Sequence, residues 1–150
     1  MSNTSDSFET YYKYNKINEE YPIIFIHGIG LNHRIWDGQI DYLKNYSTIV
    51  YDLIGHGKTP FNKKKITMEY YTKQLLDLVD GLSINKFHLV GFSIGSLIAR
   101  DFASSYSDRL SSLTIFATIY KRSENEKRQI FSRYEMMKLK KDITKKRAVH

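Results

Sequence analysis

The stretch Lys86–Arg100, KFHLVGFSIGSLIAR, decides the fold of this 150-residue chain. Phe87–Val90 is a short apolar run with the composition of a buried strand, and Ser96–Ala103 has the composition of a helix. Between them lies Gly91-Phe92-Ser93-Ile94-Gly95, a serine between two glycines. The sequence therefore predicts a strand, a tight turn and a helix in direct succession.

A serine spaced G-x-S-x-G at a strand-to-helix junction is the pattern of a nucleophile elbow. Such a turn strains the serine backbone, and side chains at Gly91 and Gly95 would collide with the neighbouring backbone. The Ser93 hydroxyl is expected to stand above the sheet, where the N-terminus of the following helix offers N–H groups to an oxyanion. The alternative interpretation is a plain turn, with Gly91 for the bend and Gly95 for close helix packing.

Apolar patterning predicts strands alternating with helices along the chain. A first strand is expected within Phe8–Lys16, and residues 1–7 are expected to be a loose end. The later expected strands are Tyr21–Ile26, Ser47–Tyr51, the elbow strand and Leu110–Ile119, and the other expected helices are Arg34–Tyr46 and Thr67–Leu82, the latter with Tyr70, Tyr71, Leu75, Leu78 and Val79 buried. This alternation predicts an α/β fold, a parallel sheet with helices on both faces in a three-layer sandwich.

Composition predicts a folded, cytoplasmic protein. Hydrophobic residues make up 41% of the chain and aromatic residues 14%. Cysteine is absent, which excludes disulfides and thiolate metal sites and favours a reducing compartment. The polar N-terminus does not resemble a signal peptide, and no apolar run approaches the roughly 20 residues that span a bilayer. We therefore expect no membrane association, and nothing in the sequence indicates a metal or an organic cofactor.

The net charge of +7 lies entirely at the C-terminal end. Residues 1–120 contain 12 Lys and Arg against 12 Asp and Glu, whereas residues 121–150 contain 11 against 4. A neutral body argues against nucleic acid as a partner. We expect residues 121–150 to form a basic amphipathic segment, a helix from Glu124 to about Ile143 with an apolar stripe that includes Ile130, Phe131, Tyr134, Met137 and Leu139.

Three loops follow the expected parallel strands: His27-Gly28-Ile29-Gly30, then Asp52-Leu53-Ile54-Gly55-His56-Gly57, then the elbow. Open α/β sheets bind ligands at the edge where such loops emerge. In this combination and order, the H-G-x-G, D-x-x-G-x-G and G-F-S-I-G stretches resemble the α/β-hydrolase fold family. The resemblance runs from about Tyr21 to Ile119, and the first loop is similar to those of small esterases and enol-lactone or carboxylester hydrolases.

The resemblance implies a role for individual residues. Ser93 matches the nucleophile, and the backbone N–H groups of Ile29 and Ile94 match the two donors of the oxyanion hole. Gly28 and Gly30 would let the first loop approach a small acyl or ester substrate. Asp52, Gly55 and Gly57 are expected to be structural: the Asp52 carboxylate would bind loop N–H groups and hold the second loop in shape.

The histidines need separate assignment, because a serine nucleophile needs a base. His27 and His56 are expected to be structural or to line the pocket, and His33 to lie near the pocket. His88 is expected to be a core residue, while His150 is the last residue of the sequence. None of the five is a good match to the family's base.

The family's acid and base follow the nucleophile in the chain, on strands later than any expected here. The sequence therefore predicts an incomplete α/β-hydrolase fold: residues 1–120 as the N-terminal part of the core, and 121–150 as the start of a truncated lid. A serine hydrolase fragment with little activity alone is the leading hypothesis.

Two other functions stay open. A non-catalytic binding protein would use the same pocket. A Rossmann-type nucleotide-binding domain would use Gly28-Ile29-Gly30 and Asp52, although His33 stands where that fingerprint has its third glycine.

Overall fold

The computed structural model describes residues 2–3, 8–118 and 121–147. The chain divides into two units, Met1–Thr118 and Ile119–His150, which are described separately. The first unit contains a sheet with helices on both faces, and the second contains one helix.

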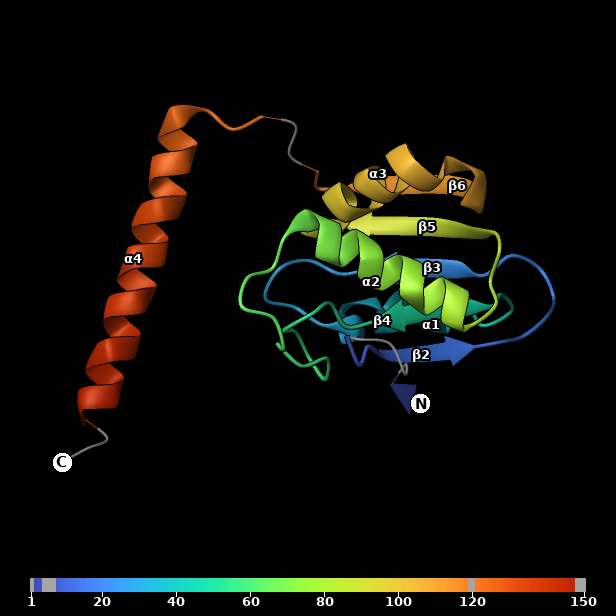
Figure 1. Cartoon of the computed structure of the whole chain (residues 1–150), viewed down its shortest axis with the longest axis horizontal. Coiled ribbons are helices and arrows are strands. Elements are labelled where there is room, and N and C mark those ends of the chain that lie inside the picture. Colours follow the sequence, from blue (N-terminus) through green and yellow to red (C-terminus); the bar gives the residue numbers. More distant parts are fainter. Residues whose placement is uncertain (1, 4–7, 119–120, 148–150) are drawn as a thin grey trace. The chain divides into compact units, whose positions relative to one another are not determined.

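The sheet has six strands in the order β1-β2-β4-β3-β5-β6 (Figure 1). The strands are β1 (Ser2–Asn3), β2 (Tyr11–Asn15), β3 (Ile23–Ile26), β4 (Thr48–Tyr51), β5 (Phe87–Phe92) and β6 (Leu110–Phe116). β3, β4, β5 and β6 are parallel, which confirms the central prediction. β2 is antiparallel to β4, so the sheet is mostly rather than wholly parallel. Antiparallel strands at one side of an otherwise parallel sheet are common in such folds. Residues 1–7 were expected to be a loose end, but Ser2–Asn3 forms the short strand β1 and pairs with β2. Residues 1 and 4–7 lie outside the described part of the chain.

Helices cover both faces of the sheet. α2 (Met68–Gly81) and α3 (Ile94–Tyr106) pack on one face over a large apolar core that includes Ile24, Leu78, Leu89 and Phe102 (Figure 1). A 3₁₀ turn η1 (His33–Trp36) and α1 (Asp37–Tyr42) cover the other face, where Trp36 packs with Phe25 and Val50. The helix expected over 34–46 is thus shorter than predicted and begins as a 3₁₀ turn.

The helix α2 follows its sequence signals closely. Thr67 is the N-cap and its hydroxyl accepts a hydrogen bond from the Tyr70 N–H at 3.4 Å, as a capping threonine does. Tyr71, Leu75, Leu78 and Val79 are buried as predicted. The prediction for Tyr70 is wrong: it is 36% exposed, and its ring touches the core only edge-on, at Phe8.

The second unit contains the helix α4 (Glu124–Arg147), which confirms the predicted helix and extends it by four residues. The apolar stripe expected on this helix stays a prediction. Ile130 and Phe131 are exposed, while the side chains of Tyr134, Met137 and Leu139 lie outside the described residues. Among the described residues, no helix is long and apolar enough to cross a membrane.

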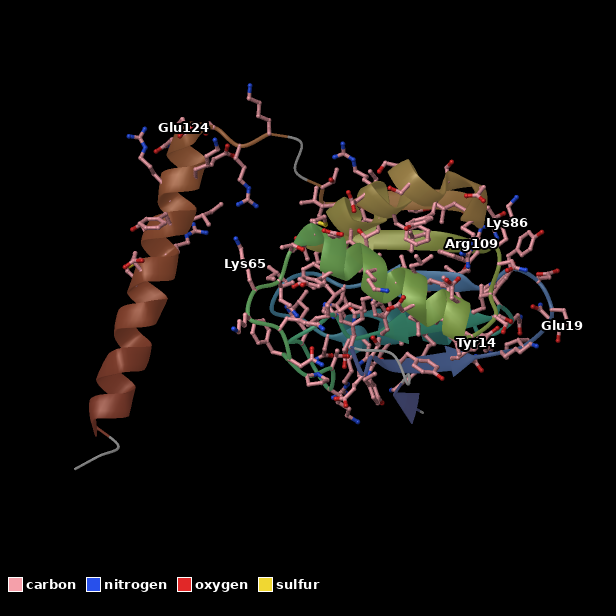
Figure 2. All side chains as sticks on the ribbon, in the orientation of Figure 1. Tyr14, Glu19, Lys65, Lys86, Arg109 and Glu124 are labelled. Carbon is pink, nitrogen blue, oxygen red and sulfur yellow. The ribbon has the colours of Figure 1, made fainter. Side chains whose placement is uncertain are left out.

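The amino ends of the parallel strands carry charged residues, whereas the carboxyl ends carry the motif loops. Figure 2 shows Glu19, Lys86 and Arg109 at the amino ends of β3, β5 and β6. Arg109 anchors the start of β6 by donating hydrogen bonds to Asp80 and to the carbonyl oxygens of Ile84 and Asn85, at 2.7–2.8 Å. The three motif loops all emerge at the opposite, carboxyl end.

Candidate functional site

Ser93 occupies the sharp turn between β5 and α3. Its backbone has φ 57° and ψ −119°, a left-handed conformation that is costly for any residue with a side chain. Two backbone hydrogen bonds hold the turn: the Ser93 N–H donates to the Phe116 carbonyl at 3.2 Å, and its carbonyl accepts from the Ser96 N–H at 2.9 Å. The strained conformation predicted from the sequence is present at this residue.

The two flanking glycines are needed for the close approach of backbone segments. A Cβ at Gly91 would overlap the carbonyl of Gly95 in the first turn of α3. A Cβ at Gly95 would lie 2.5 Å from the Ile26 carbonyl oxygen and 2.8 Å from that of His27. The first turn of α3 is therefore pressed against the end of β3, which brings the loop after β3 beside Ser93.

The loop after β3 begins with His27, which is fully buried. Its Nδ1 lies 2.8 Å from the Gly28 carbonyl oxygen, and its Nε2 accepts a hydrogen bond from the Leu53 N–H at 3.0 Å. These partners require a neutral ring with its proton on Nδ1. Burial lowers the pKa of His27 below its ordinary 6.5 and so favours this neutral form. His27 therefore links the loops after β3 and β4.

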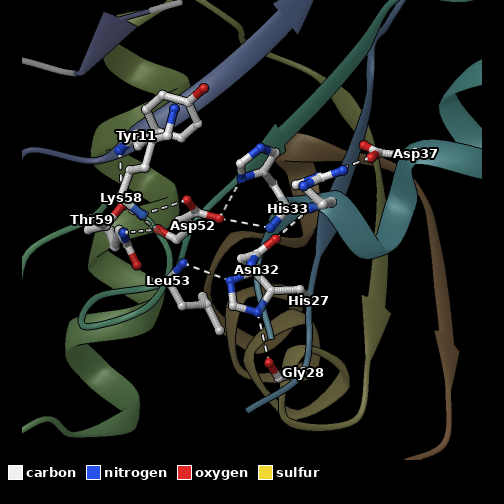
Figure 3. A network of polar contacts seen from close by, with 12 residues as sticks. Tyr11, His27, Gly28, Asn32, His33, Asp37, Asp52, Leu53, Lys58 and Thr59 are labelled. Atoms are coloured by element: carbon white, nitrogen blue, oxygen red, sulfur yellow. Dashed lines mark hydrogen bonds and ion pairs between the residues drawn. The ribbon is translucent and has the colours of Figure 1, made fainter. Parts of the chain in front are cut away.

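Asp52 is a second link between the same loops (Figure 3). Its carboxylate is inaccessible to solvent, and Oδ1 lies 2.7 Å from the His33 backbone nitrogen and 2.8 Å from His33 Nδ1. Oδ2 accepts from the Lys58 N–H at 2.9 Å. A Cβ at Gly57 would overlap the carboxylate, and Gly57 has φ 52°. The carboxylate therefore binds loop N–H groups, as the sequence predicted.

Gln74 completes this network and was missed by the sequence reasoning. It is fully buried on α2; its Oε1 accepts from the Ile54 N–H at 3.2 Å, and its Nε2 donates to the Asp52 carbonyl at 3.0 Å. The signal was a polar residue on the apolar face of the helix, beside Tyr71, Leu75 and Leu78. A buried amide there needs a polar partner, because leaving it unpaired costs about 1–3 kcal/mol.

The other predicted site residues lie around the turn. Ile94 is the first residue of α3, where backbone N–H groups have no carbonyl partner within the helix. Ile29 is 61% exposed in the loop after β3. Gly30 has φ 73°, and a Cβ on Gly28 would touch the Phe92 ring at 3.2 Å. The loop lies close to the segment that leads into Ser93.

The hydrogen bonds of the four described histidines are made with residues other than Ser93. His56 Nδ1 lies 3.0 Å from the Ile54 carbonyl oxygen, and His33 is bound to Asp52. His88 was expected in the core but is only partly buried, and its Nδ1 lies 2.8 Å from Ser112 Oγ. That pair lies on the sheet face that α2 and α3 do not cover. His150 lies outside the described residues.

Comparison with known proteins decides the family. A family model described as "alpha/beta hydrolase fold" matches residues 21–143, most of the chain and all three motif loops. The chain belongs to the alpha/beta hydrolase fold family.

The relatives of this chain include hydrolases, esterases and lactonases. The chain is 26% identical over 126 residues to (E)-2-((N-methylformamido)methylene)succinate hydrolase of Acinetobacter baylyi, covering 83% of this chain and 48% of the relative. It is 32% identical to 3-oxoadipate enol-lactonase 1 of the same organism, covering 62% and 35%. The fold resembles a solved carboxylesterase of Nitrososphaera gargenis with TM-score 0.77 and 29% identity, covering 89% of this chain and 50% of that one. The chain thus spans about half or less of the length of these alpha/beta hydrolases.

Proposed function

We propose that this chain carries the nucleophile and oxyanion-binding part of a serine hydrolase site that acts on carboxylic esters or similar acyl bonds. The observation that supports this most directly is the backbone of Ser93. A non-glycine residue held at φ 57° between a strand and a helix costs about 1–3 kcal/mol, and strain of this kind clusters at functional sites. Membership of the alpha/beta hydrolase fold family and the names of esterase and lactonase relatives support hydrolysis of an acyl bond.

The oxyanion would be bound by two backbone N–H groups. Ile94 is at the start of α3, where the helix dipole also favours negative charge. The Ile29 N–H comes from the loop after β3, which the contacts at Gly95 and Gly28 hold beside the turn. Each such donor is worth about 3 kcal/mol of transition-state stabilisation. His27, Gly28, Gly30 and Asp52 would shape and hold this loop.

The reaction would proceed through an acyl-enzyme. Ser93 Oγ attacks the acyl carbon, the proton of the hydroxyl goes to a base, the alcohol leaves, and water then releases the acid. The four described histidines are bonded elsewhere, so we infer that the 150 residues alone turn substrate over slowly or not at all. The acid and base would come from polypeptide equivalent to the part of the relatives that this chain does not match.

The substrate class, a small ester or lactone, is inferred from the names of the relatives. The lid role of residues 121–150 and the cytoplasmic location also stay predictions.

A non-catalytic binding protein is the second candidate, favoured by the same missing base. A dinucleotide site receives less support: the Asp52 carboxylate, which would bind a ribose hydroxyl in that fold, is buried and already accepts hydrogen bonds from His33 and Lys58. Saturable binding of NADH would reopen that possibility.

The proposal is tested by labelling the 150-residue chain with a fluorophosphonate probe and mapping the modified residue by mass spectrometry. We expect slow labelling confined to Ser93, and none at that peptide in the Ser93→Ala variant. Labelling spread over other serines at the same rate would contradict the assigned nucleophile. Rapid labelling of Ser93, like that of a complete serine hydrolase, would instead contradict the inference that the base is missing.

A further inference from the structure

Ser96 lies in the first turn of α3, shortly after the proposed nucleophile, and is fully buried. Its hydroxyl donates a hydrogen bond to the Ser93 carbonyl, with the two oxygen atoms 2.5 Å apart. The Ser96 N–H donates to the same carbonyl oxygen at 2.9 Å. A carbonyl oxygen has two lone pairs, so Ser96 supplies a donor for each of them.

The carbonyl that Ser96 binds belongs to the peptide group that joins Ser93 to Ile94. The described part of the chain contains no cis peptide bond, so this group is trans and planar, and its C=O and N–H point in opposite directions. The Ser93 carbonyl points into α3, towards Ser96. The Ile94 N–H therefore points out of the N-terminal end of the helix, in a direction that the bonds to the carbonyl fix.

The conformation of Ser93 needs such support from its neighbours. Its ψ of −119° sets the orientation of this peptide group and, together with φ 57°, is costly for a residue with a side chain. Residues in conformations of this kind persist only when the surrounding structure holds them firmly. The Ser93 N–H is held by the Phe116 carbonyl at 3.2 Å, so the two bonds from Ser96 are the shorter ones at this residue.

A second serine of α3 forms the same kind of bond away from the turn. The Ser104 hydroxyl donates to the Asp101 carbonyl, also three residues earlier, at 2.7 Å, and Ser104 is exposed. Serine side chains often bond to the preceding turn of a helix in this way. The bond from Ser96 differs because it is buried and acts on the peptide group that carries the Ile94 N–H.

We propose that Ser96 is a positioning residue of the oxyanion-binding site. Its hydroxyl holds the peptide group between Ser93 and Ile94, so that the Ile94 N–H stays aimed at the oxyanion. The proposal rests on the proposed function, in which this N–H is one of the two donors. Ser96 acts through the peptide group and does not itself contact the substrate.

The first test measures the Ile94 N–H directly. In Ser96→Ala, amide nitrogen NMR relaxation and relaxation dispersion should show more motion of this N–H than in the unmodified chain, because one donor to the Ser93 carbonyl is gone. Ser104→Ala is the matched control: it loses the same kind of bond on the same helix and should leave Ile94 unchanged. Equal Ile94 motion in the two variants overturns the proposal, whatever the activity of the chain.

The second test measures acetylation of Ser93 by p-nitrophenyl acetate, with imidazole added as a base. The reaction should be about two- to tenfold slower in Ser96→Ala, the effect expected of one hydrogen bond between neutral groups. The corresponding thionoester, in which sulfur replaces the carbonyl oxygen, should lose less, because sulfur is a weak hydrogen-bond acceptor. An equal loss with both esters would mean a purely structural role for Ser96 and overturns the proposal.

Circular dichroism of both alanine variants checks that they are folded. If neither ester modifies Ser93 in the unmodified chain, the proposed function fails and the role of Ser96 in binding an oxyanion fails with it. The NMR measurement separates this outcome from the other, because it reports whether the hydroxyl holds the peptide group even in a chain that does not react.

Discussion

At the scale of single residues, the site depends on one backbone conformation and one protonation state. Ser93 is held in a conformation that favours glycine, and His27 is held neutral between two backbone partners. Both are sites where the fold bears a local cost, as is typical of residues retained for function rather than for stability.

Ser93→Gly is expected to stabilise the protein by about 1 kcal/mol, because glycine adopts φ 57° without a Cβ clash. Ser93→Ala is the matched control: it also lacks the hydroxyl but keeps the Cβ, so it should gain nothing. Urea denaturation of the three proteins measures the difference. Equal stability of the two variants would contradict a strained backbone at this residue.

The lowered pKa of His27 predicts that the protein loses stability in acid. Its pKa is lowered in the folded state, so the unfolded chain binds a proton more readily. The stabilisation is complete above the ordinary value of 6.5 and is lost as the pH falls towards the lowered pKa of the folded protein. Protonation would also remove the Nε2 acceptor of the Leu53 N–H.

Denaturation midpoints above and below pH 6.5 measure this dependence. His27→Gln keeps an acceptor but does not titrate, so its midpoint should fall less in acid than that of the unmodified protein. Identical acid sensitivity of His27→Gln and the unmodified protein would show that His27 is not its source.

At the scale of elements, the site is placed by the contact between α3 and the end of β3. Gly95 makes this contact possible, since a side chain there would run into the Ile26 and His27 carbonyls. The two loops after β3 and β4 are joined by hydrogen bonds of His27 and Asp52, so all three motif loops are in contact at one end of the sheet.

Gly95→Ala is expected to destabilise the protein by about 1–3 kcal/mol, because the Cβ must force β3 and α3 apart. Gly38→Ala in α1 is the matched control, with nothing within 4 Å of its Cβ, and should be neutral or stabilising by up to about 1 kcal/mol. Thermal and urea unfolding compare the two. Tolerance of alanine at both positions would mean that α3 is not pressed against β3.

The elements were largely predictable from the sequence, because local patterns determine them. The capping threonine and apolar periodicity of α2 and the G-x-S-x-G turn each act over a few residues. The antiparallel β2, the exposure of Tyr70 and the buried amide of Gln74 depend on partners far away in the chain, and the sequence pattern does not specify those partners.

At the scale of the whole molecule, the chain contains the strands that carry the three motif loops, and it spans about half the length of these relatives. The nucleophile and the oxyanion donors were assigned from local motifs, so they could be proposed from sequence. A base is recognised only by its position in the fold, and the described histidines are held by Leu53, Asp52, Ile54 and Ser112. Among the described residues, no histidine is bonded so as to accept the proton of the proposed nucleophile Ser93.

A small diffusible base should accept the proton of the Ser93 hydroxyl in place of the missing histidine. The most direct measurement is the rate at which p-nitrophenyl acetate acetylates Ser93, with and without added imidazole, followed by intact mass and peptide mapping. Our account predicts slow acetylation that imidazole accelerates in the unmodified chain and that is absent from Ser93→Ala. Acetylation of that variant at the same imidazole-dependent rate would contradict the account.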